Sequence, residues 1–156
     1  LEMEPCDLLQ VIDEVVDSFR PRAREKRQDL RWQPPQALPQ VRGNPRILRQ
    51  VMDNLLSNAV KYTQEGGWIS VSTEEENGHV VVRVADNGIG IPPAQQPYVF
   101  DKFYRVESEA TSEIKGTGLG LTIVKTAIEK HKGRVWVESN WGQGSAFCFV
   151  LPALKT

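Results

Sequence analysis

The valine-rich segment HVVVRVA (79–85) constrains the fold most strongly, because such a run is typical of a strand buried in a sheet. The preceding segment WISVST (68–73) alternates apolar and polar residues, as a half-buried strand does. Between the two lies ENG (76–78), which supplies an Asn-Gly turn. The sequence therefore predicts a β-hairpin. The hairpin ends on DNGIG (86–90), with a carboxylate and two glycines where one turn residue would be enough.

Three other segments place apolar residues at helical spacing. The first covers about residues 7–27, and we expect a kink or an end near Pro21. The second begins with Asn44 as its N-cap and Pro45 as its first helical residue. The third runs from about residue 118 to 131 and is closed by basic residues and a glycine.

The order of these elements indicates the fold class. LRWQ (30–33) predicts a short strand, and RVWVES (134–139) with SAFCFVL (145–151) predicts a last hairpin. We expect an α+β fold: a two-layer α/β sandwich with a mixed, mostly antiparallel sheet and three helices on one face. Residues 91–115 have no sustained period, and long unpatterned loops are often lids. We expect a lid at about 92–115 that is mobile without a ligand.

Composition excludes several classes of function. The 156 residues are enough for one domain, and a net charge of −1 gives no general attraction to nucleic acid. The basic segment RPRAREKR (20–27) is interpreted as a solvated helix end. Cys6 and Cys148 lie far apart, which favours reduced thiols in a cytosolic protein. No membrane span or signal peptide is visible, and the start at Leu1 suggests a fragment of a longer protein.

The second helix carries polar residues beside its apolar stripe. At about 100° per residue, Asn54, Asn58 and Lys61 fall within a sector of roughly 60°, with Tyr62 a little beyond it. An asparagine oxygen suits Mg²⁺, a hard cation that keeps several waters and binds through phosphates. Lys61 could meet a phosphate. The alternative is a solvated helix face, which two asparagines by themselves do not exclude.

The segment KGTGLGLTIV (115–124) leads glycines at alternate positions directly into the third helix. Free N–H groups at a helix N-terminus bind anions, and glycines let phosphate approach them. The spacing differs from the dinucleotide-binding G-x-G-x-x-G motif, and the P-loop lysine is absent. Glycines for a tight turn are the alternative.

DNGIG then has an interpretation of its own. A carboxylate only accepts hydrogen bonds, so Asp86 would favour the exocyclic amine of adenine over the carbonyl of guanine. Gly88 and Gly90 would let the ring lie against the backbone, with Ile91 or Tyr62 packing on its face. An ordinary hairpin end with an Asn-Gly turn is the alternative for these five residues.

The segments QVMDNLLSNAVKYT (50–63), DNGIGI (86–91) and GTGLGL (116–121), in this order, closely resemble the ATP-binding domain of two-component sensor histidine kinases. That domain belongs to a superfamily with type II topoisomerases, a heat-shock chaperone and mismatch-repair ATPases. FDKFYR (100–105) is similar to the aromatic segment in the family's lid, and GQGSAFCFVLP (142–152) to its closing hairpin. The resemblance covers about residues 5–152.

The resemblance implies ATP and Mg²⁺ as ligands and assigns roles to matching positions. Asn58 and Asn54 would hold Mg²⁺, and the catalytic group would be Asn54, Lys61 and Arg105, the last two facing phosphates. The nucleotide-binding set would be Asn58, Lys61, Tyr62, Asp86, Gly88, Gly90, Ile91, Phe103, Gly116, Thr117, Gly118, Leu119, Gly120 and Leu121.

One position separates the members of the superfamily. Those that hydrolyse ATP have a glutamate four residues before the metal-binding asparagine, and this chain has Asn54 there. A water nucleophile needs a residue that orients it, whereas a neutral imidazole needs less help, so Asn54 favours a kinase.

Neither His79 nor His131 has the acidic, helical surroundings of the family's phosphorylated histidine. We therefore expect the acceptor on the parent chain's own dimerisation and phosphoacceptor domain, N-terminal to this one. A response regulator receiver domain would be an indirect partner. The isolated chain is expected to be monomeric and cytoplasmic, in a parent that could be anchored in a membrane.

Three alternatives from the same fold remain. An ATP-driven, dimerising clamp is disfavoured by Asn54 and by the lack of an attached transducer domain. A module that has lost activity is disfavoured by the intact glycine segments. A serine kinase of the anti-sigma type is not separated by these motifs.

Overall fold

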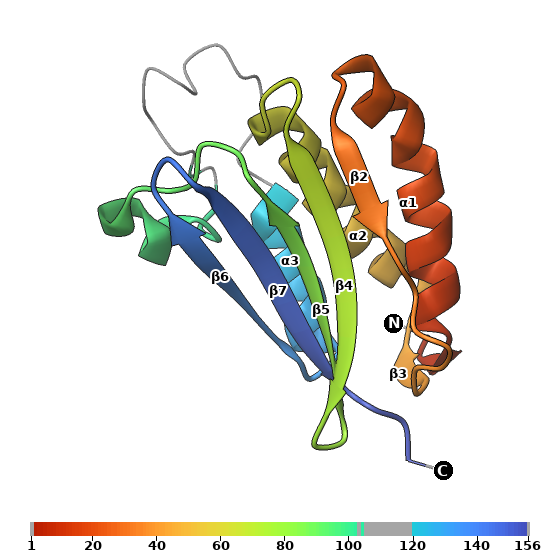
Figure 1. Ribbon diagram of the computed structural model, residues 1–156. Helices are drawn as coiled ribbons and strands as arrows, with labels where there is room; N and C mark the ends of the chain where they lie inside the picture. The colour runs from red at the N-terminus through yellow and green to blue at the C-terminus, as the bar shows by residue number, and fades with distance from the viewer. Residues whose placement is uncertain (1, 103, 105–119, 156) are drawn as a thin grey trace.

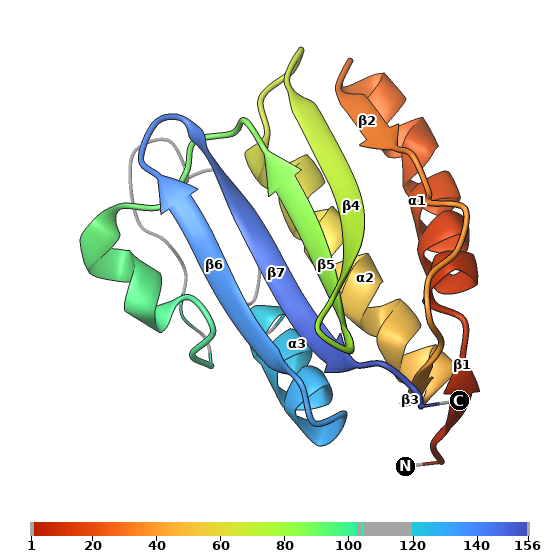
Figure 2. The ribbon, with the colours of Figure 1, turned by 60° about the horizontal axis from the view of Figure 1, so that its bottom comes forward.

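In the computed structural model, which describes residues 2–102, 104 and 120–155, a five-stranded sheet carries three helices on one face (Figures 1 and 2). The helices are α1 (Leu8–Glu25), α2 (Pro45–Tyr62) and α3 (Gly120–Lys130), with a short 3₁₀ helix η1 (Pro93–Tyr98). The strands are β1 (Glu4–Cys6), β2 (Asp29–Trp32), β3 (Val41–Gly43), β4 (Trp68–Glu76), β5 (His79–Asp86), β6 (Arg134–Asn140) and β7 (Gly144–Pro152).

The strand order of the large sheet is β2-β4-β5-β7-β6. β2 pairs with β4 in parallel, and the other neighbours are antiparallel, so the predicted mixed, mostly antiparallel sheet is confirmed. β1 and β3 form a separate antiparallel pair that the sequence did not predict. Each has three residues, too few for a period to show.

The β4–β5 hairpin forms as predicted. Asn77 and Gly78 have φ values of 52° and 77°, as a type I′ turn requires at both central residues. Val80, Val82 and Val84 are buried, and they line the core between the sheet and the helices. β5 is the central strand of the five, and Asp86, its last residue, therefore lies at one end of the middle of the sheet.

α2 begins as predicted. The Oδ1 atom of Asn44 accepts the backbone N–H of Ile47 at 3.1 Å, and Pro45 occupies the first turn. The buried side of the helix consists of Leu48, Val51, Met52, Leu55, Leu56, Ala59 and Val60. This packing fixes the rotation of α2, which decides where its polar residues point.

Of the two alternatives predicted for Pro21, an end of the helix there is wrong, because α1 continues through Pro21 to Glu25. A kink at Pro21 stays a prediction. Proline removes one backbone hydrogen bond, but Phe19 and Ala23 are buried on either side of it. Packing against the core therefore keeps both halves helical.

Both cysteines are buried and free. Cys148 lies in β7 as predicted, and burial raises its pKa to about 12, with Glu138 adding to the rise and Arg83 opposing it. A thiol with so high a pKa stays protonated and unreactive at neutral pH.

Across residues 2–102, 104 and 120–155, no helix combines the length and apolar composition that crossing a membrane requires.

Candidate functional site

Asp86 is the last residue of β5 and is only 7% exposed. Burial raises the pKa of its carboxyl group to about 6, while backbone hydrogen bonds from Gly88 and Ser145 act in the opposite direction. The bond from the Gly88 N–H measures 2.9 Å. The edge of the sheet therefore holds an acceptor in a poorly hydrated place, where its charge is costly without a partner.

The glycines of DNGIG meet the protein's own backbone. A Cβ atom on Gly88 would overlap the carbonyl oxygen of Tyr62, the last residue of α2. Gly90 has a φ of +74°, and a Cβ atom there would overlap the carbonyl oxygen of Asn140 at the end of β6. The close approach that these glycines allow is thus to α2 and to the β6–β7 turn.

Asn87 holds this segment to the start of β4, a function that the sequence reasoning missed. Its Oδ1 atom accepts the backbone N–H of Trp68 at 2.7 Å, and its own N–H donates to the Trp68 carbonyl at 3.3 Å. The Asn-Gly dipeptide was interpreted as a turn signal, which hid the side chain's contact with a residue 19 positions earlier.

α2 and the start of α3 meet at Asn54. A Cβ atom on Gly120 would lie 3.6 Å from the Asn54 Oδ1 atom. The Nδ2 atom of Asn54 is buried and has no hydrogen-bond partner within the described part of the chain. A buried amide donor without a partner costs free energy, so a ligand's acceptor at this position would satisfy it.

The other predicted site residues of α2 occupy its C-terminal half. Asn58 and Tyr62 are half-buried, and Lys61 is exposed in the last turn. Because the helix is continuous from Pro45 to Tyr62, Asn54, Asn58 and Lys61 lie on one side of it. The predicted polar stripe therefore exists in the structure.

Two predicted contact residues are part of the core. Ile91 is 5% exposed and belongs to the buried cluster, and half-buried Leu121 packs against the same cluster. Of the two residues proposed to cover a bound ring, Tyr62 is therefore the more accessible. The sequence could not decide between them, because the burial of each side chain depends on packing between distant segments.

Six predicted site residues lie outside the described residues: Phe103, Arg105, Gly116, Thr117, Gly118 and Leu119. A hydrogen bond joins the segments before and after residues 105–119, because the Thr122 hydroxyl donates to the Phe100 carbonyl at 2.9 Å.

The first part of the predicted lid forms the short helix η1 beside β6 (Figure 2), and Val99 after it is buried. The start of the predicted lid thus contains a short helix that the sequence did not predict, and the lid and its mobility stay predictions.

The two histidines have different surroundings. His131 is 3% exposed; its Nδ1 atom lies 2.7 Å from the Ala127 carbonyl, and its Nε2 atom accepts the Asn44 N–H at 3.0 Å. His79 is exposed at the start of β5. With both ring nitrogens of His131 bonded, the structure agrees with excluding it as a phosphoacceptor.

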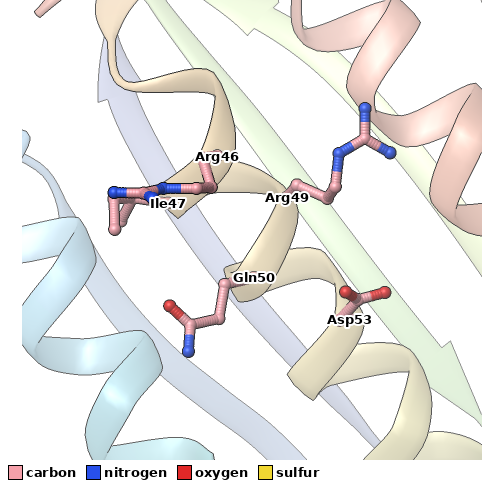
Figure 3. A pocket seen from close by; sticks show the side chains of 5 residues that line it. All are labelled: Arg46, Ile47, Arg49, Gln50 and Asp53. Atoms are coloured by element: carbon pink, nitrogen blue, oxygen red, sulfur yellow. The ribbon is translucent and has the colours of Figure 1, made fainter.

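A shallow hollow of about 450 Å³ lies on the N-terminal half of α2 (Figure 3). It is lined by Arg46, Ile47, Arg49, Gln50 and Asp53. Figure 3 shows Arg46 and Gln50 directed toward α3 and Arg49 toward α1, where Arg49 forms an ion pair with Glu14. The hollow adjoins Asn54 along the helix and contains none of the residues predicted from sequence.

The site chemistry suits a nucleotide with its metal. In the described part of the chain, no cluster of three His, Cys, Asp or Glu residues could hold a metal. The buried Nδ2 donor of Asn54 beside the start of α3 would suit an acceptor oxygen of a ligand, such as a phosphate oxygen. Asp86 supplies a separate acceptor at the edge of the sheet.

Comparison with known proteins agrees with this geometry. The sensor histidine kinase WalK of Bacillus subtilis (strain 168) is 44% identical over 107 residues, covering 67% of this chain and 18% of WalK. Full-length ShkA, solved in complex with AMPPNP, superposes with a TM-score of 0.86 at 32% identity, covering 100% of this chain and 32% of that one. Histidine kinase ThkA, solved in complex with the response regulator protein TrrA, gives 0.82 at 29% identity, covering 99% and 42%.

The chain spans about a fifth to two fifths of the length of the curated relatives that it matches. Residues 43–155 match the family described as histidine kinase-, DNA gyrase B- and HSP90-like ATPase. The chain therefore belongs to this ATPase family and has the fold of its histidine kinase catalytic domains.

Proposed function

We propose that this domain binds Mg²⁺-ATP and donates the γ-phosphoryl group to a histidine on a separate dimerisation and phosphoacceptor domain. The buried carboxylate of Asp86 is the observation that carries the proposal. It is an acceptor held at the end of β5 by two backbone hydrogen bonds, and the adenine amine would supply the partner that its charge lacks.

The remaining roles divide between α2 and the start of α3. Tyr62 would cover the adenine ring, and Lys61 and Arg105 would neutralise phosphate charge. Asn58 and Asn54 would hold Mg²⁺, which neutralises and aligns the phosphates for transfer. The unpartnered Asn54 Nδ2 donor next to Gly120 supports a phosphate oxygen at this position, while the Oδ1 atom of the same side chain would face the metal. Residues 116–120 would wrap the phosphates from the N-terminal side of α3.

Asn54 also favours transfer to a histidine over hydrolysis. An amide side chain cannot accept a proton from water at neutral pH, so position 54 lacks the base that an attacking water needs. A neutral imidazole attacks without such help. The buried, fully bonded His131 and the exposed His79 in a β-hairpin leave the acceptor to another domain.

We further propose that the domain works in the cytoplasm with its own acceptor domain, and that a response regulator then receives the phosphoryl group. ThkA, with 29% identity, forms a complex with a response regulator, which supports this class of partner. The domain by itself would be a monomer, because its acceptor domain would provide the dimer contact.

Titration calorimetry tests the proposed ligand. We expect the domain to bind a non-hydrolysable ATP analogue better than the matching GTP analogue, and better with Mg²⁺ than without. Asp86→Asn should weaken ATP binding about 10- to 100-fold, since a hydrogen bond to a charged group is lost. Glu75→Gln, which removes an exposed carboxylate from β4, is the matched control. Equal ATP affinity in Asp86→Asn would refute the assignment of Asp86.

A transfer assay tests the reaction. The domain should phosphorylate a separately added phosphoacceptor domain while releasing little free phosphate in its absence. Steady ATP hydrolysis by the domain alone, unaffected by the acceptor, would favour the ATPase clamp instead.

A further inference from the structure

Ser139, near the end of β6, connects three segments that are distant in sequence. Its Oγ atom accepts the backbone N–H of Ile91 at 2.8 Å and donates to the Gly144 carbonyl at 3.0 Å. It also lies 2.9 Å from the Ser145 Oγ atom. A serine hydroxyl has one donor and two acceptor positions, so the Ser145 hydroxyl must donate to it. All three positions of the Ser139 hydroxyl are then used inside the protein.

The bond to Ile91 fixes the segment that follows Asp86. Gln96 reinforces it, because its Nε2 atom donates to the Ile91 carbonyl at 2.9 Å and to the Ser139 carbonyl at 3.1 Å. The Gly142 N–H donates to the Ile89 carbonyl at 2.7 Å. Residues 89–91 are thus held against the β6–β7 turn. The Ser139 hydroxyl bonds to Ile91 on one side and to Gly144 and Ser145, at the start of β7, on the other.

The bond to Ser145 reaches Asp86 from the other side. Ser145 pairs with Asp86 across β7 and β5, and its backbone N–H donates to the Asp86 carboxylate. The second backbone donor to that carboxylate, Gly88, lies in the segment between Asp86 and Ile91. Of the two donors to the carboxylate, Ser145 is thus itself bonded to Ser139, and Gly88 lies three residues before Ile91, which Ser139 also bonds.

We propose that Ser139 is a positioning residue for base recognition: its hydroxyl holds Ile91 and Ser145 so that the Asp86 carboxylate is aimed at the adenine amine. Ser139 does not itself contact the base. The identification of the ligand as an adenine nucleotide rests on the proposed function above. The positioning of the segment after Asp86 by Ser139 is independent of that function.

The test compares Ser139→Ala with Ser139→Thr, which keeps a hydroxyl and suits a strand. In Ser139→Ala the affinity for the ATP analogue should fall about tenfold, since a partly buried donor and acceptor lose their partner. Its preference for adenine over guanine should fall as well. Ser139→Thr should stay within about twofold of the wild type, a rescue that would show the hydroxyl to be responsible.

Val135→Ala is the control for general destabilisation. Val135 lies on the same strand, pairs with Phe149 and packs against the core. It should lower stability but leave the adenine preference unchanged. Wild-type affinity and preference in a folded Ser139→Ala, or equal losses in Ser139→Ala and Ser139→Thr, would overturn the proposal.

A second readout needs no nucleotide and separates this proposal from the proposed function. By NMR, Ser139→Ala should exchange the Ile91 amide about tenfold faster and should raise the pKa of the Asp86 carboxyl further, because the Gly88 and Ser145 donors that lower it are held less firmly. Ser139→Thr should preserve both values. If the wild type binds no nucleotide, the proposed function fails, and these two NMR measurements still decide the role of Ser139. Unchanged exchange and titration in Ser139→Ala would overturn it.

Discussion

Asp86 is buried where its charge has no cation beside it within the described residues, and its two hydrogen-bond donors come from the backbone. Its pKa of about 6 exceeds the ordinary value of 3.8. Between these two pH values the folded state therefore binds more protons than the unfolded state. The free energy of unfolding falls as the pH rises through this window, and the loss persists above pH 6.

Asp86→Asn should for this reason stabilise the domain without nucleotide at pH 7. We expect a gain of about 2 to 3 kcal/mol in the free energy of unfolding, since the shift is about two pH units. The gain should disappear at about pH 3, below both pKa values, where both states are mostly protonated. Urea unfolding at about pH 3 and at pH 7 measures it. A variant less stable than the wild type at pH 7 would contradict the cost assigned to the buried carboxylate.

His131 joins the end of α3 to the start of α2 through its two ring nitrogens. Its replacement by alanine leaves the Asn44 N–H without its partner and a cavity in the core. We expect His131→Ala to lower the free energy of unfolding by about 2 to 3 kcal/mol in urea. His79→Ala is the control, because His79 is exposed and should change stability by less than about 0.5 kcal/mol. Equal effects of the two substitutions would disprove the structural role of His131.

At the scale of elements, the loop after β5 is held by its contact with the end of β6. Gly90 is needed both for its φ of +74° and because the Asn140 carbonyl occupies the place of a Cβ atom. Gly78 has a similar φ of +77° but has nothing within 4 Å of a Cβ atom. Alanine substitutions at Gly78 and at Gly90 therefore separate the cost of a positive φ from the added cost of steric overlap.

Gly78→Ala should cost about 1 kcal/mol of stability, the cost of a positive φ alone. Gly90→Ala should cost clearly more, about 2 kcal/mol or above, because the loop must also move away from β6. Urea unfolding of both variants tests this. Similar losses in the two would mean that the loop moves without cost and that the contact with Asn140 is not a constraint.

At the scale of the whole molecule, the proposed site combines groups from both layers. Asp86 belongs to the sheet, whereas Asn54, Asn58 and Lys61 belong to a helix packed on it. A ligand that contacts both layers binds only when they are docked. Nucleotide binding should therefore stabilise the complete fold and not one element of it.

Mg²⁺-ATP analogue at 100 times its Kd should add about 2.7 kcal/mol of stability. For a domain of this size the Tm should rise by about 5 to 10 °C. Differential scanning calorimetry measures the rise, with the GTP analogue at the same concentration as the control. No rise with the ATP analogue would argue against binding to the folded domain, and an equal rise with GTP would argue against adenine selection.

Much of this molecule is encoded locally. The α2 stripe, its Asn44 cap, the Asn-Gly hairpin turn and the valines of β5 each follow from the period and from turn chemistry, which depend on near neighbours. For the same reason the α2 residues Asn54, Asn58 and Lys61 could be assigned to one side of a helix before its partners were known.

The contacts that position the site were decided by tertiary structure. The bond of Asn87 to Trp68, of Ser139 to Ile91 and of His131 to Asn44 join residues 19, 48 and 87 positions apart. These bonds depend on strand register and helix packing, so the local spacing of apolar and polar residues does not predict them. The continuation of α1 through Pro21 has the same origin, since burial on both sides outweighed a local breaker. By itself the sequence determined the longer helices and strands and the family of the site. The packed core determined which groups meet, because hydrogen bonds form only where the fold brings a donor and an acceptor within reach.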